Sequence, residues 1–170
     1  MALEMMTNQG LGNLDAILTT VSGGGMASGI SIAAKAINPS IKIILVEPVG
    51  KHLSECLKTG ERKWPNPPQF LGTIAEGIKT QQLGQLTFPI LCDLAEHDVI
   101  TVNDEQMIEG MRMVAERMKL VIEASAGAVV AAAMYKLSDI VEKWPHIKNI
   151  GVVLCGGNTD LNDLAWIKTK

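Results

Sequence analysis

The chain has 170 residues, of which 15 are Lys or Arg and 18 are Asp or Glu, and its formal net charge is −3 at neutral pH. This length is typical of one domain, and it is enough to bury a core without a disulfide or a structural metal. The chain lacks the clustered basic residues that binding to nucleic acid or an anionic membrane requires. We therefore expect small molecules and proteins as its partners.

The cysteines and the amino terminus point to a reducing compartment. Cys56, Cys92 and Cys155 are widely spaced and predict neither a disulfide framework nor a zinc site. The first ten residues lack the basic region of a signal peptide. The longest run of apolar residues and glycine is about half of a bilayer span. We expect a cytoplasmic protein with no membrane association.

Alternating strand and helix patterns predict an α/β fold with a parallel sheet flanked by helices. Residues 1–6 resemble the end of a helix. Three short, β-branched and apolar segments predict buried parallel strands, at 15–21, 42–46 and 150–154, and 99–102 could form a further short strand. Helices are expected at 26–37, 53–59, 83–95, 104–119 and 126–143. The proline-rich segment 64–68 predicts an ordered surface loop.

Each long strand runs into a turn or a glycine-containing loop. These loops occupy residues 22–25, 47–50 and 155–158. The carboxyl ends of parallel strands share one edge of a sheet, and ligands of open α/β sheets bind at that edge. We therefore expect the functional site there.

The first loop is rich in glycine and opens a helix. It reads Ser22, Gly23, Gly24, Gly25 and Met26. Consecutive glycines let backbone N–H groups turn inward as an anion site, to which the helix dipole contributes. The dinucleotide fingerprint fails at Ser28 and the Walker pattern fails at Ile30. The loop therefore predicts phosphate binding by the backbone alone, and the alternative is a tight turn with no ligand.

Cys155 ends the third strand at the same edge. A cysteine nucleophile would need a basic neighbour, whereas His52, His97 and His146 all fall in polar segments typical of the surface. Taken alone, a cysteine such as Cys155 is more often a small buried apolar residue.

Several motifs together resemble one enzyme family. They are Ser22-Gly23-Gly24-Gly25-Met26, Val46-Glu47-Pro48, Ile74-Ala75-Glu76-Gly77-Ile78-Lys79, Glu116-Arg117-Met118-Lys119 through Glu123 with Ala126-Gly127, and Leu154-Cys155-Gly156-Gly157-Asn158. Their order and spacing resemble serine racemases and the related serine/threonine dehydratases. These are fold-type II (tryptophan synthase β-like) enzymes that use pyridoxal phosphate. The resemblance covers almost the whole chain and implies that residues 1–170 are the carboxy-terminal half of the large, cofactor-binding domain.

The resemblance implies roles for individual residues. Ser22 to Met26 would hold the cofactor phosphate, and Cys155 would face the pyridine nitrogen, where a neutral group makes the ring a weaker electron sink than an Asp would. Gly77 and Glu123 would line the cofactor, and Lys119 would lie near a bound nucleotide such as an ATP effector. The alternatives are a helix cap for Gly77 and solvated charges for Glu123 and Lys119.

Two departures from the family pattern stand out. Serine racemases hold a divalent cation with a Glu, a backbone carbonyl and an Asp; Glu47 matches the Glu, but Leu53 stands at the Asp position. Loss of a carboxylate weakens a Mg²⁺ or Ca²⁺ site, which depends on oxygen ligands. The Schiff-base lysine segment and the loop that grips the substrate carboxylate, both in the family's amino-terminal half, have no counterpart here.

No lysine of this chain is expected to replace it. Those at 35, 42, 58, 63, 136, 143, 148 and 168 stand among polar or turn residues that favour solvent. The resemblance therefore implies a serine racemase or an L-serine/L-threonine ammonia-lyase, dimeric at full length and inactive as this chain alone. The alternatives are a non-catalytic partner of a full-length homologue and an autonomous nucleotide-phosphate-binding module.

Overall fold

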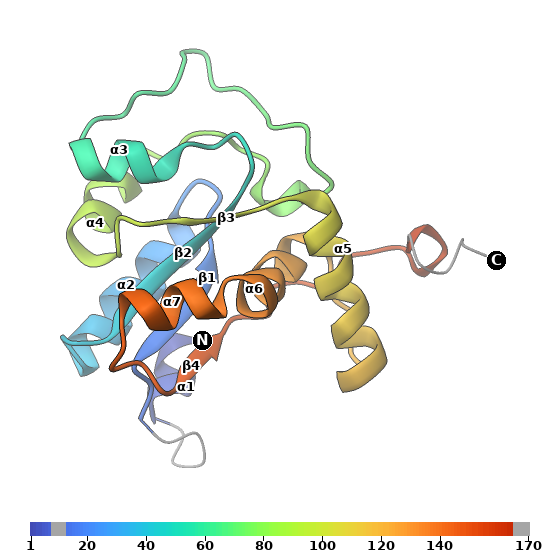
Figure 1. Ribbon diagram of the computed structural model, residues 1–170. Coiled ribbons are helices and arrows are strands. Elements are labelled where there is room, and N and C mark those ends of the chain that lie inside the picture. Colours follow the sequence, from blue (N-terminus) through green and yellow to red (C-terminus); the bar gives the residue numbers. More distant parts are fainter. Residues whose placement is uncertain (8–12, 165–170) are drawn as a thin grey trace.

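The computed structural model describes residues 1–7 and 13–164, and its centre is a four-stranded parallel sheet (Figure 1). The strands are β1 (Ala16–Thr20), β2 (Lys42–Pro48), β3 (Ile100–Val102) and β4 (Ile150–Val152). Their order across the sheet is β3-β2-β1-β4, and every pairing is parallel. The predicted α/β class and all four predicted strands are confirmed.

Helices cover both faces of this sheet. In Figure 1, α5, α6 and α7 lie in front of it and α2 lies behind. The helices on the rear face of the sheet and next to it are α1 (Ala2–Thr7), α2 (Gly25–Ile37), α3 (Leu53–Thr59) and α4 (Thr87–Leu94). Those of the front are α5 (Asp104–Met113), its π-helical continuation η2 (Val114–Met118), α6 (Ala124–Tyr135) and α7 (Leu137–Lys143). Two short 3-10 helices complete the set, η1 (Glu76–Ile78) and η3 (Leu161–Asp163).

The central strands are mostly apolar because both of their faces are buried. Ile17 of β1 packs with Ala27 and Ile30 of α2 in one core cluster. The next residue, Leu18, packs with Ala128 and Val129 of α6 in the cluster on the opposite face. Successive side chains of a strand point to opposite faces, so a strand covered on both sides has no polar alternation.

The single helix expected at 126–143 is wrong. The segment forms α6 and α7, which meet at an angle of 64°. Lys136 lies at the break: its amide donates to the Ala132 carbonyl and ends α6, while its carbonyl accepts from the Ile140 amide and begins α7. The bend buries Ile140 in the core cluster under α6, and this burial favours two helices over one.

Two other helix ends differ from the sequence prediction. Helix α4 begins at Thr87, not at 83, because the Gly84 amide donates to the Gly23 carbonyl (3.0 Å) and stays outside the helix. Regular α5 ends at Met113, and the chain passes through η2 to Lys119, whose φ of 60° is left-handed and stops the helix.

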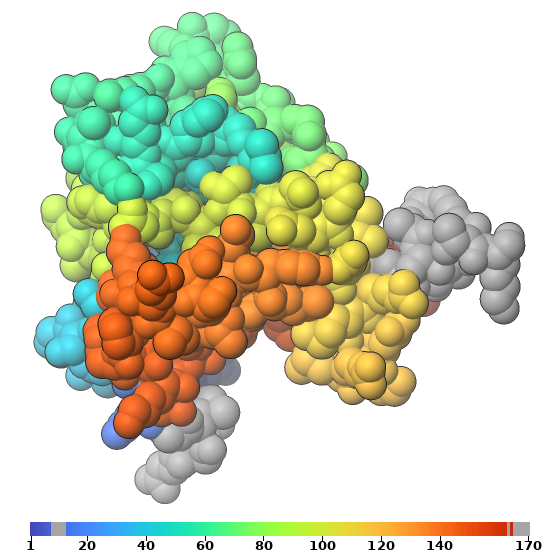
Figure 2. Space-filling model, in the orientation of Figure 1, coloured from blue at the N-terminus to red at the C-terminus, as the bar shows by residue number. Residues whose placement is uncertain are grey.

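The segment between β2 and β3 forms the upper part of the molecule in Figures 1 and 2. It carries α3, the irregular loop expected at 64–68, and α4. Figure 2 also shows α6 and α7 covering the near face of the sheet. Of the helices described, none alone is long and apolar enough to cross a membrane, and α6 and α7 reach that length and composition only as a bent pair.

Candidate functional site

A cavity of about 220 Å³ lies at the carboxyl ends of β1 and β4. Every residue that the sequence assigned to cofactor binding lines it: Ser22, Gly23, Gly24, Gly25, Met26, Gly77, Glu123 and Cys155. Thr20, Ala27, Ile78 and Ser125 complete the lining and were not predicted. The glycine loop and the loop after β4 therefore meet at one edge of the sheet, as the strand order requires.

The glycine loop is held in place by the start of α4. The Gly23 carbonyl accepts hydrogen bonds from Thr87 Oγ1 (2.6 Å) and from the Gly84 amide (3.0 Å). Gly24 has a φ of +94°, and a Cβ there would stand 2.7 Å from Thr87 Oγ1. Only glycine combines this backbone angle with so close an approach to Thr87.

The backbone donors of this loop are unused by the protein. Within the part of the chain that the structure describes, the amides of residues 22–27 donate to no protein acceptor, and the first with a partner is that of Ser28, which reaches the Gly24 carbonyl at 2.8 Å. A Cβ on Gly23 or Gly25 would meet nothing within 4 Å, so the backbone faces open space there. Free amides at the start of a 13-residue helix attract an anion.

Cys155 reaches the cavity from the opposite side. Its Sγ lies 3.3 Å from the hydroxyl of Thr20, the last residue of β1, and either atom could donate. Cys155 is partly buried, unlike Cys56, which is 2% exposed within the core. Cys155 thus lines the cavity, and it also packs against the core cluster that contains Ile17.

Glu123 and Gly77 pack closely at the third side. The Gly77 amide donates to Ser125 Oγ (2.9 Å), and a Cβ on Gly77 would stand 3.0 Å from Glu123 Oε1. Glu123 Oε2 accepts from the Asn158 amide (3.1 Å), and Gly156, with a φ of +110°, lies against the same carboxylate. Glu123 therefore joins the start of α6 to the loop after β4 and is not a freely solvated charge.

The unpredicted lining residues left little trace in the sequence. Thr20 lies in an apolar strand, where a single threonine is typical of a core position without a function. The residue is 1% exposed, and it lines the cavity. Ser125 precedes the Ala126-Gly127 motif by one residue. A buried hydroxyl needs a hydrogen-bond partner. A serine directly before the apolar Ala126-Gly127 motif was therefore the one sign in the sequence that Ser125 has a role.

Two sequence-predicted site residues lie outside this cavity. Lys119 is exposed after η2, and its Nζ donates to the Glu116 carbonyl (2.7 Å); its nucleotide role stays a prediction. Glu47 lies near the carboxyl end of β2, where it is 3% exposed. Its Oε2 accepts from the Leu53 amide (3.2 Å) and its Oε1 from the Thr101 hydroxyl (3.5 Å). Burial raises the pKa of Glu47 to about 7.

A fully buried lysine lies in the turn that follows Glu47. Lys51 has no exposed surface, and its ammonium donates to the Thr80 carbonyl. Burial lowers the pKa of Lys51 to about 8, against the attraction of the Glu47 carboxylate. The burial of Lys51 leaves no signal in the sequence, because Gly50, Lys51 and His52 are typical of an exposed turn.

The residues around Glu47 do not fit a divalent cation. Leu53 is fully buried in the core. In the described ranges 1–7 and 13–164, no three His, Cys, Asp or Glu side chains are grouped as a metal site requires. Hard cations need several oxygen ligands, and of the two carboxylate positions that the resemblance implies, only that of Glu47 carries a carboxylate.

The cavity at the glycine loop does fit the phosphate of pyridoxal phosphate. Its open glycine backbone leaves room for a phosphate, and the loop amides that have no acceptor among the described residues are available as donors. In the described residues, no lysine lines this cavity.

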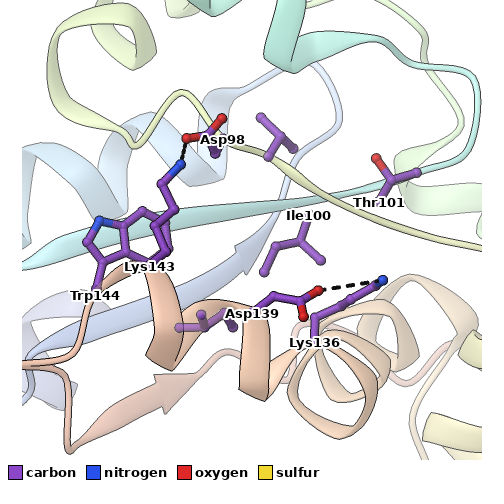
Figure 3. A pocket seen from close by; sticks show the side chains of 9 residues that line it. Asp98, Ile100, Thr101, Lys136, Asp139, Lys143 and Trp144 are labelled. Carbon is purple, nitrogen blue, oxygen red and sulfur yellow. Dashed lines mark ion pairs between the residues drawn. The ribbon is translucent and has the colours of Figure 1, made fainter.

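A second cavity, of about 320 Å³, lies between α7 and β3 (Figure 3). Ion pairs border it, one between Lys143 and Asp98 and one between Lys136 and Asp139 (3.7 Å). It holds none of the residues to which the family resemblance assigns a role.

Comparison with known proteins agrees with this geometry. The sequence profile of the family described as "Pyridoxal-phosphate dependent enzyme" matches residues 1–156. Serine racemase of Rattus norvegicus is 40% identical over 98% of this chain and 48% of its own length. L-threo-3-hydroxyaspartate ammonia-lyase of Saccharomyces cerevisiae is 36% identical over 92% of this chain and 46% of its own.

A solved structure is also similar. The crystal structure of a pyridoxal 5'-phosphate-dependent aspartate racemase is 53% identical, with a TM-score of 0.91 over 97% of this chain and 50% of that one. The chain thus spans about half the length of the relatives it matches.

Proposed function

We propose, from the premise that this chain belongs to the pyridoxal-phosphate-dependent enzyme family, that it forms the phosphate-binding part of a racemase or ammonia-lyase for small amino acids. The family match covers residues 1–156, and the parallel sheet is that of the fold-type II members. The observation that carries the proposal is the convergence of eight sequence-assigned residues on one cavity.

The chain's own residues would bind and orient the cofactor. Amides of the glycine loop would hold the phosphate, and Thr87, through the Gly23 carbonyl, would keep the loop in its binding shape. Cys155 would approach the pyridine ring as a neutral partner, positioned by Thr20. When bound, pyridoxal phosphate withdraws electrons from the α-carbon of an amino acid, which labilises the bonds at that carbon. A neutral ring partner suits racemisation or loss of a β-hydroxyl, which require less electron withdrawal.

The substrate proposal rests on the relatives. The similarity to serine racemase, hydroxyaspartate ammonia-lyase and threonine deaminase supports L-serine, L-threonine or another β-hydroxy amino acid as the substrate. The product would be a D-amino acid, or a 2-oxo acid and ammonia. The aspartate racemase, at 53% identity, adds aspartate as a candidate substrate. A homodimer and a nucleotide effector near Lys119 belong to the same proposal and depend on the family alone.

Binding of the phosphate is tested with two ligands and one variant. Equilibrium dialysis should show that pyridoxal phosphate binds the chain more tightly than pyridoxal, which lacks the phosphate. Gly23→Ala places a methyl group in open space on the cavity wall, so it should keep the thermal midpoint and weaken pyridoxal phosphate binding at least about tenfold. Equal binding of the two ligands would contradict the proposed role of the glycine loop.

The reaction is tested on the protein isolated from its native source. We expect a near-visible absorbance band, a lysine-linked cofactor in mass spectrometry, and turnover of L-serine, L-threonine or L-aspartate, followed by chiral analysis and 2-oxo acid detection. A colourless protein of the same chain length, without a lysine-linked cofactor, would instead favour the non-catalytic partner.

A further inference from the structure

The turn after β2 buries two opposite charges that the proposed cofactor site does not use. Glu47 is 3% exposed and Lys51 is 0% exposed, and three residues lie between them in the chain. Neither lines the cavity at the glycine loop. A buried charge without compensation is costly, so each of these groups is stabilised by the other, by an external ion, or by losing its charge.

We propose that the Lys51 ammonium is the resident cation of this turn, so that the chain needs and takes no divalent cation beside Glu47. The family resemblance implies a cation beside Glu47, and this chain instead supplies a positive charge from the Lys51 side chain. This inference is independent of the proposed reaction.

The oxygen atoms of the turn are already engaged within the chain. Glu47 accepts from the Leu53 amide and the Thr101 hydroxyl. The carbonyl of Lys51 accepts from Trp64 Nε1 (2.7 Å), and the carbonyl of Gly50 accepts from Gln81 Nε2 (3.3 Å). A divalent cation would have to break several of these bonds to gather ligands.

The Lys51 ammonium has a hydrogen-bond acceptor within the chain. Lys51 Nζ donates to the Thr80 carbonyl, and among the described residues the buried Oε1 of the next residue, Gln81, has no hydrogen-bond partner. An ammonium has three donors, and the Thr80 carbonyl takes one of them. The backbone turns sharply to bring the lysine inside, with left-handed φ angles at Gly50 (97°) and His52 (58°).

The first test is a cation titration of the unmodified chain. After treatment with EDTA and dialysis, millimolar MgCl2, CaCl2 or MnCl2 should change its Tm by less than about 1 °C. Electron paramagnetic resonance should show that added Mn²⁺ stays free. A rise in Tm of several degrees, or binding of one Mn²⁺ per chain, would overturn the proposal.

The second test is a double-mutant cycle on the two charges. Lys51→Met should lower the Tm on the order of 10 °C, because it leaves the Glu47 carboxylate buried without a cation. Adding Glu47→Gln to Lys51→Met should recover more than half of that loss. The matched control is Lys58→Met, which removes a lysine with a 54% exposed side chain in the same segment and should change the Tm by less than about 3 °C.

The cycle stays decisive if Lys51→Met alone fails to fold. The Glu47→Gln/Lys51→Met variant carries no buried charge at the turn and should fold cooperatively. If the double variant also fails to fold, or is no more stable than Lys51→Met, the ammonium does not compensate Glu47, and the proposal is wrong.

Discussion

Thr20 and Cys155 meet across the sheet at 3.3 Å between Oγ1 and Sγ, although 135 positions separate them in the chain. Thr20 ends β1, and Cys155 follows β4, which pairs with β1 from Ala16 to Leu18. This contact links the two loops of the candidate cofactor site, because the next residues along the chain from Thr20 are Val21 and the glycine loop.

The position of Cys155 predicts an ordered pattern of thiol modification. Cys155 and Cys92 are partly buried, whereas Cys56 is 2% exposed. Burial raises the pKa of both Cys56 and Cys92, which lowers their thiolate fraction at neutral pH. With a disulfide reagent and peptide mapping by mass spectrometry, we expect Cys155 to react first and Cys56 only on unfolding.

Pyridoxal phosphate should protect Cys155 selectively. Of the three cysteines, Cys155 lines the candidate cavity, so excess cofactor should slow its modification and leave the rate at Cys92 unchanged. Equal protection of both thiols would mean that the ligand acts elsewhere or by general stabilisation.

The backbone of Gly24 predicts a large penalty for a single methyl group. Gly24→Ala combines a φ of +94° with a Cβ 2.7 Å from Thr87 Oγ1, so we expect a loss of about 2 to 4 kcal/mol in the free energy of unfolding. Urea denaturation followed by circular dichroism measures it. Gly60→Ala is the matched control, because Gly60 has a φ of +70° and nothing within 4 Å; it should cost about 1 kcal/mol. Similar losses in the two variants would remove the contact with Thr87 as the cause.

Much of the fold was predictable because its strands are buried on both faces. Such strands read as short apolar runs, and their carboxyl ends place 22–25 and 155–158 at one edge whatever the details of packing. The resemblance to a family then selected Gly77 and Glu123, which no local pattern would have brought to that edge.

The features that the sequence did not predict depend on tertiary packing. Lys51 follows a glycine and precedes a histidine, so the sequence resembles an exposed turn; its burial arises from Trp64 and Thr80, which reach the turn from later in the chain. The break at Lys136 likewise arises from burial of Ile140 and not from a helix-breaking residue. Helix propensity is a weak term that such burial overrides.

Asp15 predicts an acid-sensitive contribution to stability. Its carboxylate accepts from the amides of Lys148 and Asn149, both at 2.8 Å, and these bonds lower its pKa below the ordinary 3.8. The folded state therefore binds this proton less readily than the unfolded chain, so the stabilisation is present above pH 3.8 and disappears as the pH falls through the lowered pKa.

The variant Asp15→Asn isolates this contribution. The stability difference from the parent chain should be constant between about pH 5 and 7 and should shrink below about pH 4, as measured by urea unfolding across a pH series. Glu142→Gln, at an exposed position of α7, should show no such convergence. A constant difference down to the lowest pH would show that the Asp15 side chain acts through packing and not through its charge.

The crossing of α5 and α6 predicts that one added methyl group will disturb both stability and the cofactor cavity. A Cβ on Gly110 would stand 2.6 Å from the Gly127 carbonyl, and a Cβ on Gly127 would stand 2.7 Å from the Met107 carbonyl, so the two backbones are in contact. Gly110→Ala must push α6 away and should cost about 1 to 3 kcal/mol.

Because the start of α6 carries Ser125 and follows Glu123, the same shift should weaken pyridoxal phosphate binding several-fold. Gly29→Ala, in the interior of α2 with nothing within 4 Å of the added Cβ, should instead stabilise the chain by up to about 1 kcal/mol, since alanine is the better helix former. If Gly110→Ala were as stable as Gly29→Ala, α5 and α6 could not cross so closely, and the position of Glu123 at the cavity would need another support.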